Sequence, residues 1–240
     1  MVDYGIEVEA IVNNSFIEDA GLVRGDYHHG NSMCAGWKIE RDSSISSRGE
    51  FNDTLNIEFV STVCRGRHAF SKRLQKFKGE FTTFSERLSD VLAFNSSCGC
   101  HIHFSIPKGV GRKAWYNHFT ELRDDYFSRI DSSTILSAPL KRKLRKHYFR
   151  GYATKLKKEE WLKGTGDRSK EFNFQSESSN KGMEWRSINL LGVTTWNEFF
   201  EVLETAADCI ETFISKIQKY EVKEKICFNR SEVSRLFENV

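Results

Sequence analysis

The sequence predicts an α+β fold in which a mainly antiparallel sheet packs one face against helices. Five short segments alternate apolar and polar residues with a period of two, as half-buried strands do. Elsewhere, apolar residues recur every three or four positions, which indicates amphipathic helices. The chain of 240 residues contains no linker rich in Pro, Gly and Ser. We therefore expect one domain that spans residues 1–240.

The first predicted strand, residues 4–11, presents two carboxylates on one face. Its alternation places Ile6 and Val8 on one side and Glu7 and Glu9 on the other. Side chains two residues apart in a strand lie about 7 Å apart, so ionised carboxylates there repel each other unless cations hold them. The pattern fits either a solvated half-exposed strand or a cation site. Later segments repeat it, which favours the cation site.

Two further strands also carry acids on their polar face. Residues 37–42 place Glu40 and Asp42 opposite their apolar side chains, and residues 55–61 do the same with Glu58. Residues 12–36, which precede them, predict a loop.

A fourth strand, residues 98–106, adds imidazoles to the polar face through His101 and His103. Cys98 and Cys100 precede them and raise the alternative of a zinc site. Four ligands within six residues of an extended strand cannot easily surround one ion, so this spacing argues against zinc.

The last predicted strand, residues 183–188, places Glu184 and Arg186 on one face. Before it lie a basic segment, residues 139–158, and a polar loop, residues 159–182, which is a candidate lid. The basic segment fits a solvated helix face, a phosphate site or a nucleic-acid site.

Amphipathic periodicity predicts three main helices, in residues 71–94, in residues 112–130 and from Thr195 onward. Gly79 is a candidate break in the first of them. Thr195 and Glu198 form a capping box at the start of the third helix, and Asn229 with Glu232 predicts a cap for a short final helix.

Composition excludes several classes of protein. There is neither an apolar run of about 18 residues nor a basic-then-apolar leader, so we expect a soluble cytoplasmic protein. Six cysteines in such a chain predict free thiols. A net charge of +3 is too small to argue for nucleic acid by itself.

Together, the strands predict one polar face that can hold metal ions. Its ligands would be carboxylates with imidazoles, a set that suits Mg²⁺ or Mn²⁺ beside substrate phosphates. The predicted members of this face are Glu7, Glu9, Asp42, Glu58, His101, His103, Glu184 and Arg186.

Five motifs in this order resemble the amidoligase family of the glutamine synthetase and glutamate-cysteine ligase superfamily. They are Gly-x-Glu-x-Glu, Trp-x-x-x-x-Asp-x-Ser, Glu-Phe-Val-Ser, Cys-Gly-x-His-x-His and Glu-x-Arg, within residues 4–190. The resemblance implies a curved, mainly antiparallel sheet that forms a funnel. It also implies an ATP-dependent ligase that joins a carboxylate to an amine through an acyl phosphate, with Mg²⁺ or Mn²⁺.

The same resemblance implies roles for individual residues. Glu7, Glu9, Glu58, His103 and Glu184 would be metal ligands, and Arg186 would stabilise the transferring phosphoryl group. Asp42 would be an outer ligand or contact the amine, with Glu50 as a weaker candidate, and His101 would be either catalytic or structural. Arg150 and Lys155 would contact the ATP phosphates.

Two alternatives remain open. A polyanion-binding protein would use residues 141–158, and a metal-dependent hydrolase would use the same polar face to activate water. The acid, the amine and the oligomeric state are not predicted, because the loops that would select substrates have no diagnostic composition.

Overall fold

A computed structural model describes residues 1–19, 31–33, 36–106, 112–149, 153–155, 157, 170–174 and 182–237. Its strands are β1 (Asp3–Asn13), β2 (Asn31–Met33), β3 (Trp37–Arg41), β4 (Thr54–Ser61), β5 (Cys64–Arg65), β6 (Leu92–Ala93), β7 (Cys100–Ser105), β8 (Phe172–Phe174) and β9 (Gly182–Ile188). Its helices are α1 (Asn14–Asp19), α2 (Arg67–Thr82), α3 (Leu88–Val91), α4 (Arg112–Ser132), α5 (Ala138–Lys146) and α7 (Trp196–Phe237).

The strands form one open antiparallel sheet with β1 near its middle. Its order is β2-β3-β4-β1-β7-β9-β8, and β5 and β6 also pair with β1. The strand pairs of this sheet are antiparallel. The α+β class and the antiparallel sheet agree with the sequence prediction.

The register between strands separates the sheet into an apolar and a polar face. Ile6 lies opposite Ile102, and Val8 lies opposite Phe59 and Cys100, so apolar residues meet on one side. The intervening positions hold Glu7 and Glu9, which meet His101 and Glu58 on the other side. Since the side-chain period of a strand is two, these pairings fix which face each residue serves.

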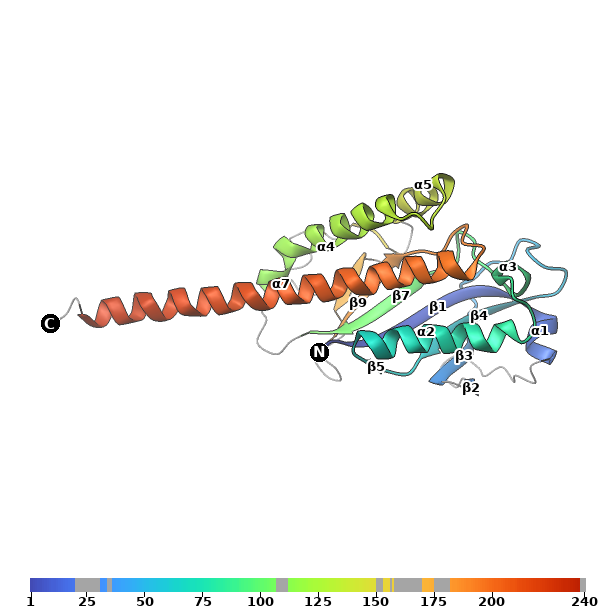
Figure 1. Ribbon diagram of the computed structural model, residues 1–240, viewed down its shortest axis with the longest axis horizontal. Helices are drawn as coiled ribbons and strands as arrows, with labels where there is room; N and C mark the ends of the chain where they lie inside the picture. Colours follow the sequence, from blue (N-terminus) through green and yellow to red (C-terminus); the bar gives the residue numbers. More distant parts are fainter. Residues whose placement is uncertain are drawn as a thin grey trace.

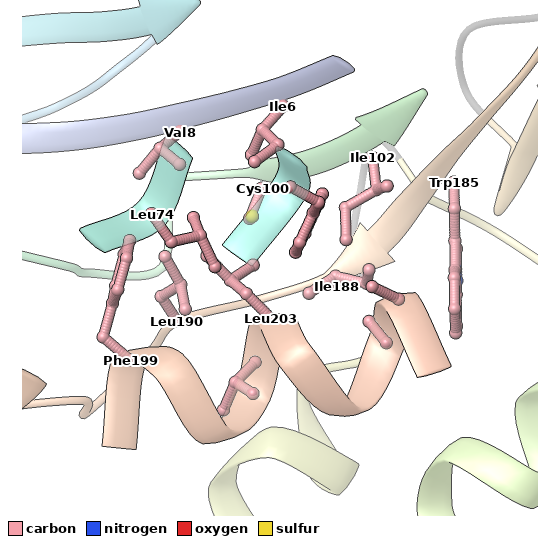
Figure 2. Close-up of a cluster of buried hydrophobic side chains, with 14 of the residues drawn as sticks. Ile6, Val8, Leu74, Cys100, Ile102, Trp185, Ile188, Leu190, Phe199 and Leu203 are labelled. Carbon is pink, nitrogen blue, oxygen red and sulfur yellow. The ribbon is translucent and has the colours of Figure 1, made fainter. Parts of the chain in front are cut away.

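Helices α2, α4 and α7 cover the apolar face (Figure 1). Phe77 of α2 packs on Phe59 of β4, and Tyr126 of α4 packs on Trp185 of β9. Figure 2 shows part of this core, in which Phe199 of α7 lies in one cluster with residues of β1 and α2. These three helices therefore pack against the apolar face and not against the polar face.

Phe77 is central to the aromatic part of the core. It is fully buried, and its ring centroid lies 4.6 Å from Trp37, 4.9 Å from Phe81 and 5.1 Å from Phe59. Phe77→Ala is expected to cost about 3–5 kcal/mol of unfolding free energy through lost burial and the cavity left behind. That corresponds to a fall in melting temperature of about 10 °C.

Circular dichroism melting tests this prediction, with Lys76→Ala as the control. Lys76 is the exposed neighbour on the same helix, so its removal is expected to change stability by no more than about 0.5 kcal/mol. Equal melting temperatures for Phe77→Ala and Lys76→Ala would contradict the central role of Phe77.

Helix α7 begins over the sheet and continues far beyond the other elements (Figure 1). Its 42 residues correspond to roughly 63 Å at the usual helical rise. Nevertheless, none of the helices in the described part of the chain is long and apolar enough to cross a membrane.

Several element boundaries differ from the sequence prediction. The helix predicted in residues 71–94 is α2, which begins earlier at Arg67 and ends at Thr82; Gly79 lies inside it. Short α3 and β6 follow it, and β6 adds to β1 through Leu92 and Ala93. Gly66 precedes α2 with a φ of 81°, which only glycine adopts readily, and this sets the earlier start.

The predicted loops also contain structure. β1 runs on to Asn13, and α1 and β2 occupy parts of residues 12–36. β8 and the start of β9 lie within residues 159–182, of which most lie outside the described residues. The separate final helix predicted near Asn229 is wrong, since α7 continues through that position to Phe237.

Candidate functional site

The polar face of the sheet gathers acids from neighbouring strands into one row. Glu9 of β1 lies directly opposite Glu58 of β4, and Glu58 lies opposite Glu40 of β3. Like charges in directly opposed positions destabilise a sheet. A fold that keeps three acids in such a row needs protons or cations there to offset the repulsion.

Glu7 binds both histidines of β7. His101 Nδ1 lies 3.0 Å from Glu7 Oε2, and His103 Nε2 lies 2.9 Å from Glu7 Oε1. Burial raises the pKa of the Glu7 carboxyl, but the hydrogen bonds from His101 and His103 outweigh this and hold the pKa well below its usual range. Glu7 is therefore ionised at neutral pH.

Three overlapping groups of side chains place their ligand atoms within 4.8 Å of one another. The groups are Glu7, His103 and Glu184; Glu7, Glu58 and His101; and Glu9, Asp42 and Glu58. Glu7 and Glu58 each belong to two groups. The face thus offers three neighbouring positions at which a metal ion could be bound by at least three protein ligands.

Asn173 and Arg186 both contact Glu184, which is 3 % exposed. Asn173 of β8 donates from Nδ2 to Glu184 Oε2 over 2.9 Å, and Arg186 Nη1 pairs with Glu184 Oε1. Asn173 Oδ1 and Arg186 Nε are buried and have no hydrogen-bond partner among the described residues. Buried polar atoms are normally paired, so these two atoms would readily contact a bound ligand.

Glu58 lies between Glu9 and Glu40 in the row of acids, and its pKa is strongly raised. Burial raises the pKa of its carboxyl, and the neighbouring charges of Glu7, Glu9, Asp42 and Glu40 add to this, bringing it to about 8. Burial also raises the pKa of Glu9. Without a cation, Glu58 therefore holds a proton at neutral pH, and a metal ion would displace that proton on binding.

This gives a prediction for the pH dependence of stability. The folded pKa of Glu58 lies above its ordinary value of 4.5, so its stabilising contribution is complete below about pH 4.5 and is lost as the pH rises through about 8. In EDTA, we expect the melting temperature to fall between pH 5 and pH 8.5. Glu58→Gln is expected to reduce this fall, because its amide cannot ionise.

Added Mn²⁺ is expected to reverse the trend for the wild type, since the deprotonated carboxylate binds the ion. Glu171, whose pKa burial raises to about 7, contributes to the fall in both proteins and cancels in the comparison. An equal fall in melting temperature in the wild type and in Glu58→Gln would show that ionisation of Glu58 is not the cause of the pH dependence.

Gly99 lets β7 approach the acidic row closely. Its N–H donates to Glu9 Oε2 over 2.6 Å, and a Cβ at this position would lie 2.8 Å from His101 Nε2 and 3.0 Å from Glu9 Oε1. Gly99→Ala must therefore displace His101 or Glu9. We expect Mn²⁺ affinity to fall about 10- to 100-fold, the effect usual for disturbed ligand positioning.

Gly79→Ala is the matched control, because a Cβ there meets open space on α2. It is expected to preserve Mn²⁺ affinity and to raise helix stability by up to about 1 kcal/mol. Calorimetric titration with Mn²⁺ measures both variants. Unchanged affinity in Gly99→Ala would exclude a role for this close approach.

A cavity of about 650 Å³ opens beside the acidic row, within the size range of small-molecule sites. Glu9, His101 and Arg186 of the polar face are among its lining residues. Other walls come from the loop between β3 and β4, the residues before β7 and the segment after α5, and they include Ser44, Ser46, Arg48, Ser96, Ser97, Cys98, His147, Tyr148 and Ala153.

The structure brings together most of the predicted site. Glu7, Glu9, Asp42, Glu58, His101, His103 and Glu184 all join the three ligand groups, and Arg186 contacts Glu184. Asp42, expected either as an outer ligand or as a contact of the amine, offers an atom to the ligand group of Glu9 and Glu58. His101 is hydrogen-bonded to Glu7, which agrees with a structural role, and it also offers an atom to one ligand group; its catalytic role stays a prediction.

Three other candidates have a different outcome. Arg150 lies outside the described residues. Lys155 is exposed, lies near Glu171, whose pKa its charge lowers, and is not among the residues that line the cavity. Glu50 joins none of the ligand groups found among the described residues; its carboxylate instead accepts hydrogen bonds from Asn95 Nδ2 and the Arg48 N–H.

The basic segment is partly used for packing. Lys141 Nζ donates to the backbone oxygens of Asp131 and Ser133 at the end of α4, over 2.8 and 2.5 Å. Arg145 pairs with Asp131 and lies over the Phe127 ring. Lys141 and Arg145 therefore have partners within the protein, and a bound polyanion is not needed to explain their positions.

The cysteine predictions can be tested for four of the six positions. Cys64, Cys98, Cys100 and Cys209 are free and buried, in agreement with the expectation of thiols. Cys100 lies on the apolar face opposite Val8, whereas His101 contacts Glu7 on the polar face. The four-ligand zinc alternative therefore does not form.

Sequence reasoning missed Asn173, Gly99 and the loop residues of the cavity as parts of the site. Asn173 lay in a predicted loop and had no strand partner until β8 was placed against β9. Gly99 was present in a motif, but its close approach depends on tertiary pairing. Neither a scan against models of known protein families nor a search of curated proteins gives a match to this chain.

Proposed function

We propose that the chain is an ATP-dependent ligase that joins a carboxylate to an amine, using Mg²⁺ or Mn²⁺ on the polar face of the sheet. One observation carries the proposal: three ligand groups overlap through Glu7 and Glu58, and two of their members, Glu9 and His101, line a cavity together with Arg186. Several cations held side by side, with an arginine next to them, suit a polyphosphate better than a single carboxylate.

The residues fit hard divalent cations. Carboxylate oxygens are the preferred ligands of Mg²⁺, and the imidazoles make Mn²⁺ an equally suitable ion. Two features would be relieved by a bound cation: the raised pKa of Glu58, and the Oδ1 of Asn173, for which the described part of the chain supplies no hydrogen-bond partner. Bound ions would neutralise the phosphate charge and draw it toward the sheet.

Side chains of the protein would stabilise the phosphoryl group and hold the metal ligands in place. Arg186 offers its Nε, which has no partner among the described residues, to an oxygen of the γ-phosphoryl group and stabilises the charge that develops during transfer. Asn173 holds Glu184, and Glu7 fixes both imidazoles. Preorganisation of this kind accounts for most of the catalysis in phosphoryl transfer.

The reaction proposed balances in two steps. A carboxylate oxygen of the acid attacks the γ-phosphorus of ATP, and ADP leaves with the bridging oxygen. The amine then attacks the acyl carbon, the C–O bond to phosphate breaks, and inorganic phosphate and a proton are released with the amide.

Hydroxylamine provides a direct test, because it replaces the amine and converts an acyl phosphate into a hydroxamate. Purified protein would be incubated with ATP, Mg²⁺, hydroxylamine and a panel of carboxylic acids labelled with ¹⁸O. We expect hydroxamate formation, and ¹⁸O in the released phosphate, for at least one acid. ATP hydrolysis without either product for any acid would favour the metal-dependent hydrolase instead.

A further inference from the structure

A β-bulge in β9 places two consecutive residues opposite one residue of β7. Trp185 and Ile188 of β9 both pair with apolar residues of β7, and both are buried in the core (Figure 2). A single residue of β7, His101, lies between their two partners, and the register shifts there. Arg186 and Ser187 therefore both lie opposite His101, as the two residues of a bulge do.

The bulge decides which face Ser187 serves. Strict alternation after Trp185 would place Arg186 on the polar face and Ser187 in the core. Ile188 takes the core position instead, so the bulge leaves Arg186 and Ser187 together on the polar side. In agreement with this, both residues line the cavity. The Arg186 N–H also donates to the Glu171 oxygen over 2.9 Å, which holds the bulge in position.

The hydroxyl group of Ser187 is buried without a partner. Ser187 is 2 % exposed, and its Oγ has no hydrogen-bond partner among the described residues. By contrast, the Ser97 hydroxyl of the same cavity accepts from the Ser46 N–H over 2.9 Å and donates to Asn95 Oδ1 over 2.7 Å. Ser44 is exposed, so water can bind it. A buried hydroxyl without a partner costs free energy, which a ligand oxygen would recover.

Arg186 carries an unsatisfied donor next to this hydroxyl. Its Nε is buried, has no partner in the described part of the chain, and can only donate a hydrogen bond. Two neighbouring donors that both lack an acceptor suit an anionic group with several oxygens. A phosphoryl group has this chemistry, because one of its terminal oxygens can accept from Arg186 and another from Ser187.

We propose that Ser187 is a phosphate-binding residue whose hydroxyl donates to an oxygen of the γ-phosphoryl group, next to Arg186. This inference rests on the proposed ligase function, but it adds a residue that strand alternation assigns to the core. The hydroxyl would contact the γ-phosphoryl group and not the other two phosphates. Ser187 would therefore help the site to distinguish ATP from ADP.

Two nucleotides that differ by the γ-phosphoryl group test the assignment without requiring turnover. Calorimetric titrations with Mg²⁺ would compare β,γ-methylene ATP with ADP, on the wild type and on Ser187→Ala. We expect Ser187→Ala to bind β,γ-methylene ATP about 10- to 100-fold less tightly, the usual loss for a hydrogen bond to a charged group. We expect ADP affinity to be unchanged. Equal losses for the two nucleotides, or no loss for either, would overturn the assignment.

Two further variants control for side effects of the substitution. Ser44→Ala makes the same change at an exposed serine that lines the same cavity, so it is expected to bind both nucleotides like the wild type. Ser187→Cys retains a side chain of similar shape with only a weak donor. It is expected to lose affinity for β,γ-methylene ATP as Ser187→Ala does. Wild-type affinity in Ser187→Cys would overturn the role of the hydroxyl.

The melting temperature separates a ligand contact from a structural contact. Ser187→Ala removes a buried hydroxyl that lacks a partner, so the ligand-free variant is expected to melt at or above the wild-type temperature. Saturation with β,γ-methylene ATP is expected to raise the melting temperature of the wild type more than that of the variant, because stabilisation follows affinity. A fall of more than about 4 °C in the ligand-free variant would overturn the proposal, since the hydroxyl would then have a structural partner.

The outcomes separate this inference from the ligase proposal. If the wild type and Ser187→Ala bind β,γ-methylene ATP equally, the role of Ser187 is overturned and the ligase proposal stands. Failure of the wild type to bind either nucleotide would overturn the ligase proposal. Titration of tripolyphosphate in the presence of Mn²⁺ then decides the role of Ser187: weaker binding by Ser187→Ala supports phosphate binding, and equal or absent binding overturns it.

Discussion

Glu7→Gln is expected to weaken Mn²⁺ binding by on the order of 100-fold or more and to abolish metal-dependent binding of an ATP analogue. Glu7 belongs to two of the three ligand groups and also orients His101 and His103. The amide keeps the volume of the side chain but removes a charge and cannot accept from both histidines through two oxygens. One substitution therefore disturbs two neighbouring metal positions.

The measurement is calorimetric titration with Mn²⁺, and then with the ATP analogue in the presence and absence of Mg²⁺. Glu201→Gln, a change of the same kind on α7, controls for the loss of one negative charge. Circular dichroism checks that both variants are folded. Wild-type metal and nucleotide binding by folded Glu7→Gln would exclude the polar face as the metal site.

Arg186→Gln is expected to lower ATP turnover by on the order of 10³-fold, the lower end of the range for an arginine that stabilises phosphoryl transfer. Arg186 lines the cavity and has a buried Nε without a partner among the described residues. Its loss also frees Glu184 from an ion pair, so we expect Mn²⁺ binding to be retained.

This separation of turnover from metal binding distinguishes Arg186 from the ligands. Arg186→Lys is expected to recover only part of the rate, since an ammonium group lacks the planar arrangement of donors. Arg65→Gln, an exposed arginine on β5, is the control for net charge. A loss of Mn²⁺ binding equal to that in Glu7→Gln would make Arg186 a structural partner of Glu184 rather than a catalytic residue.

Much of the polar face could be predicted because strand alternation is a local property. Once Ile6 and Val8 are assigned to the core, Glu7 and Glu9 must lie on the opposite face. The same reasoning correctly placed Glu58, His101, His103 and Glu184, since each lies in a strand with clear alternation. It needed no knowledge of which strands are neighbours.

The parts that could not be predicted depend on contacts between distant segments. β5, β6 and β8 are two or three residues long, too short for a period to be recognised, and they form through pairing with β1 and β9. Arg48 and Asn173 belong to the site because a loop and a short strand fold back onto it. Helix α2 ends at Thr82 although apolar residues continue beyond it at helical spacing, because Leu92 and Ala93 pair with β1 instead.

The position of β1 at the centre of the sheet links the assembly of the site to the folding of the chain. Its neighbours β4 and β7 are contributed by residues about 50 and 95 positions later, so the ligands meet only after long-range pairing. A slip of one residue in either pairing would turn Glu7 toward the helices and Ile6 toward the ligand groups. A divalent ion bound as proposed would therefore favour the correctly registered sheet over slipped or unfolded chains, and so would help to select the register during folding.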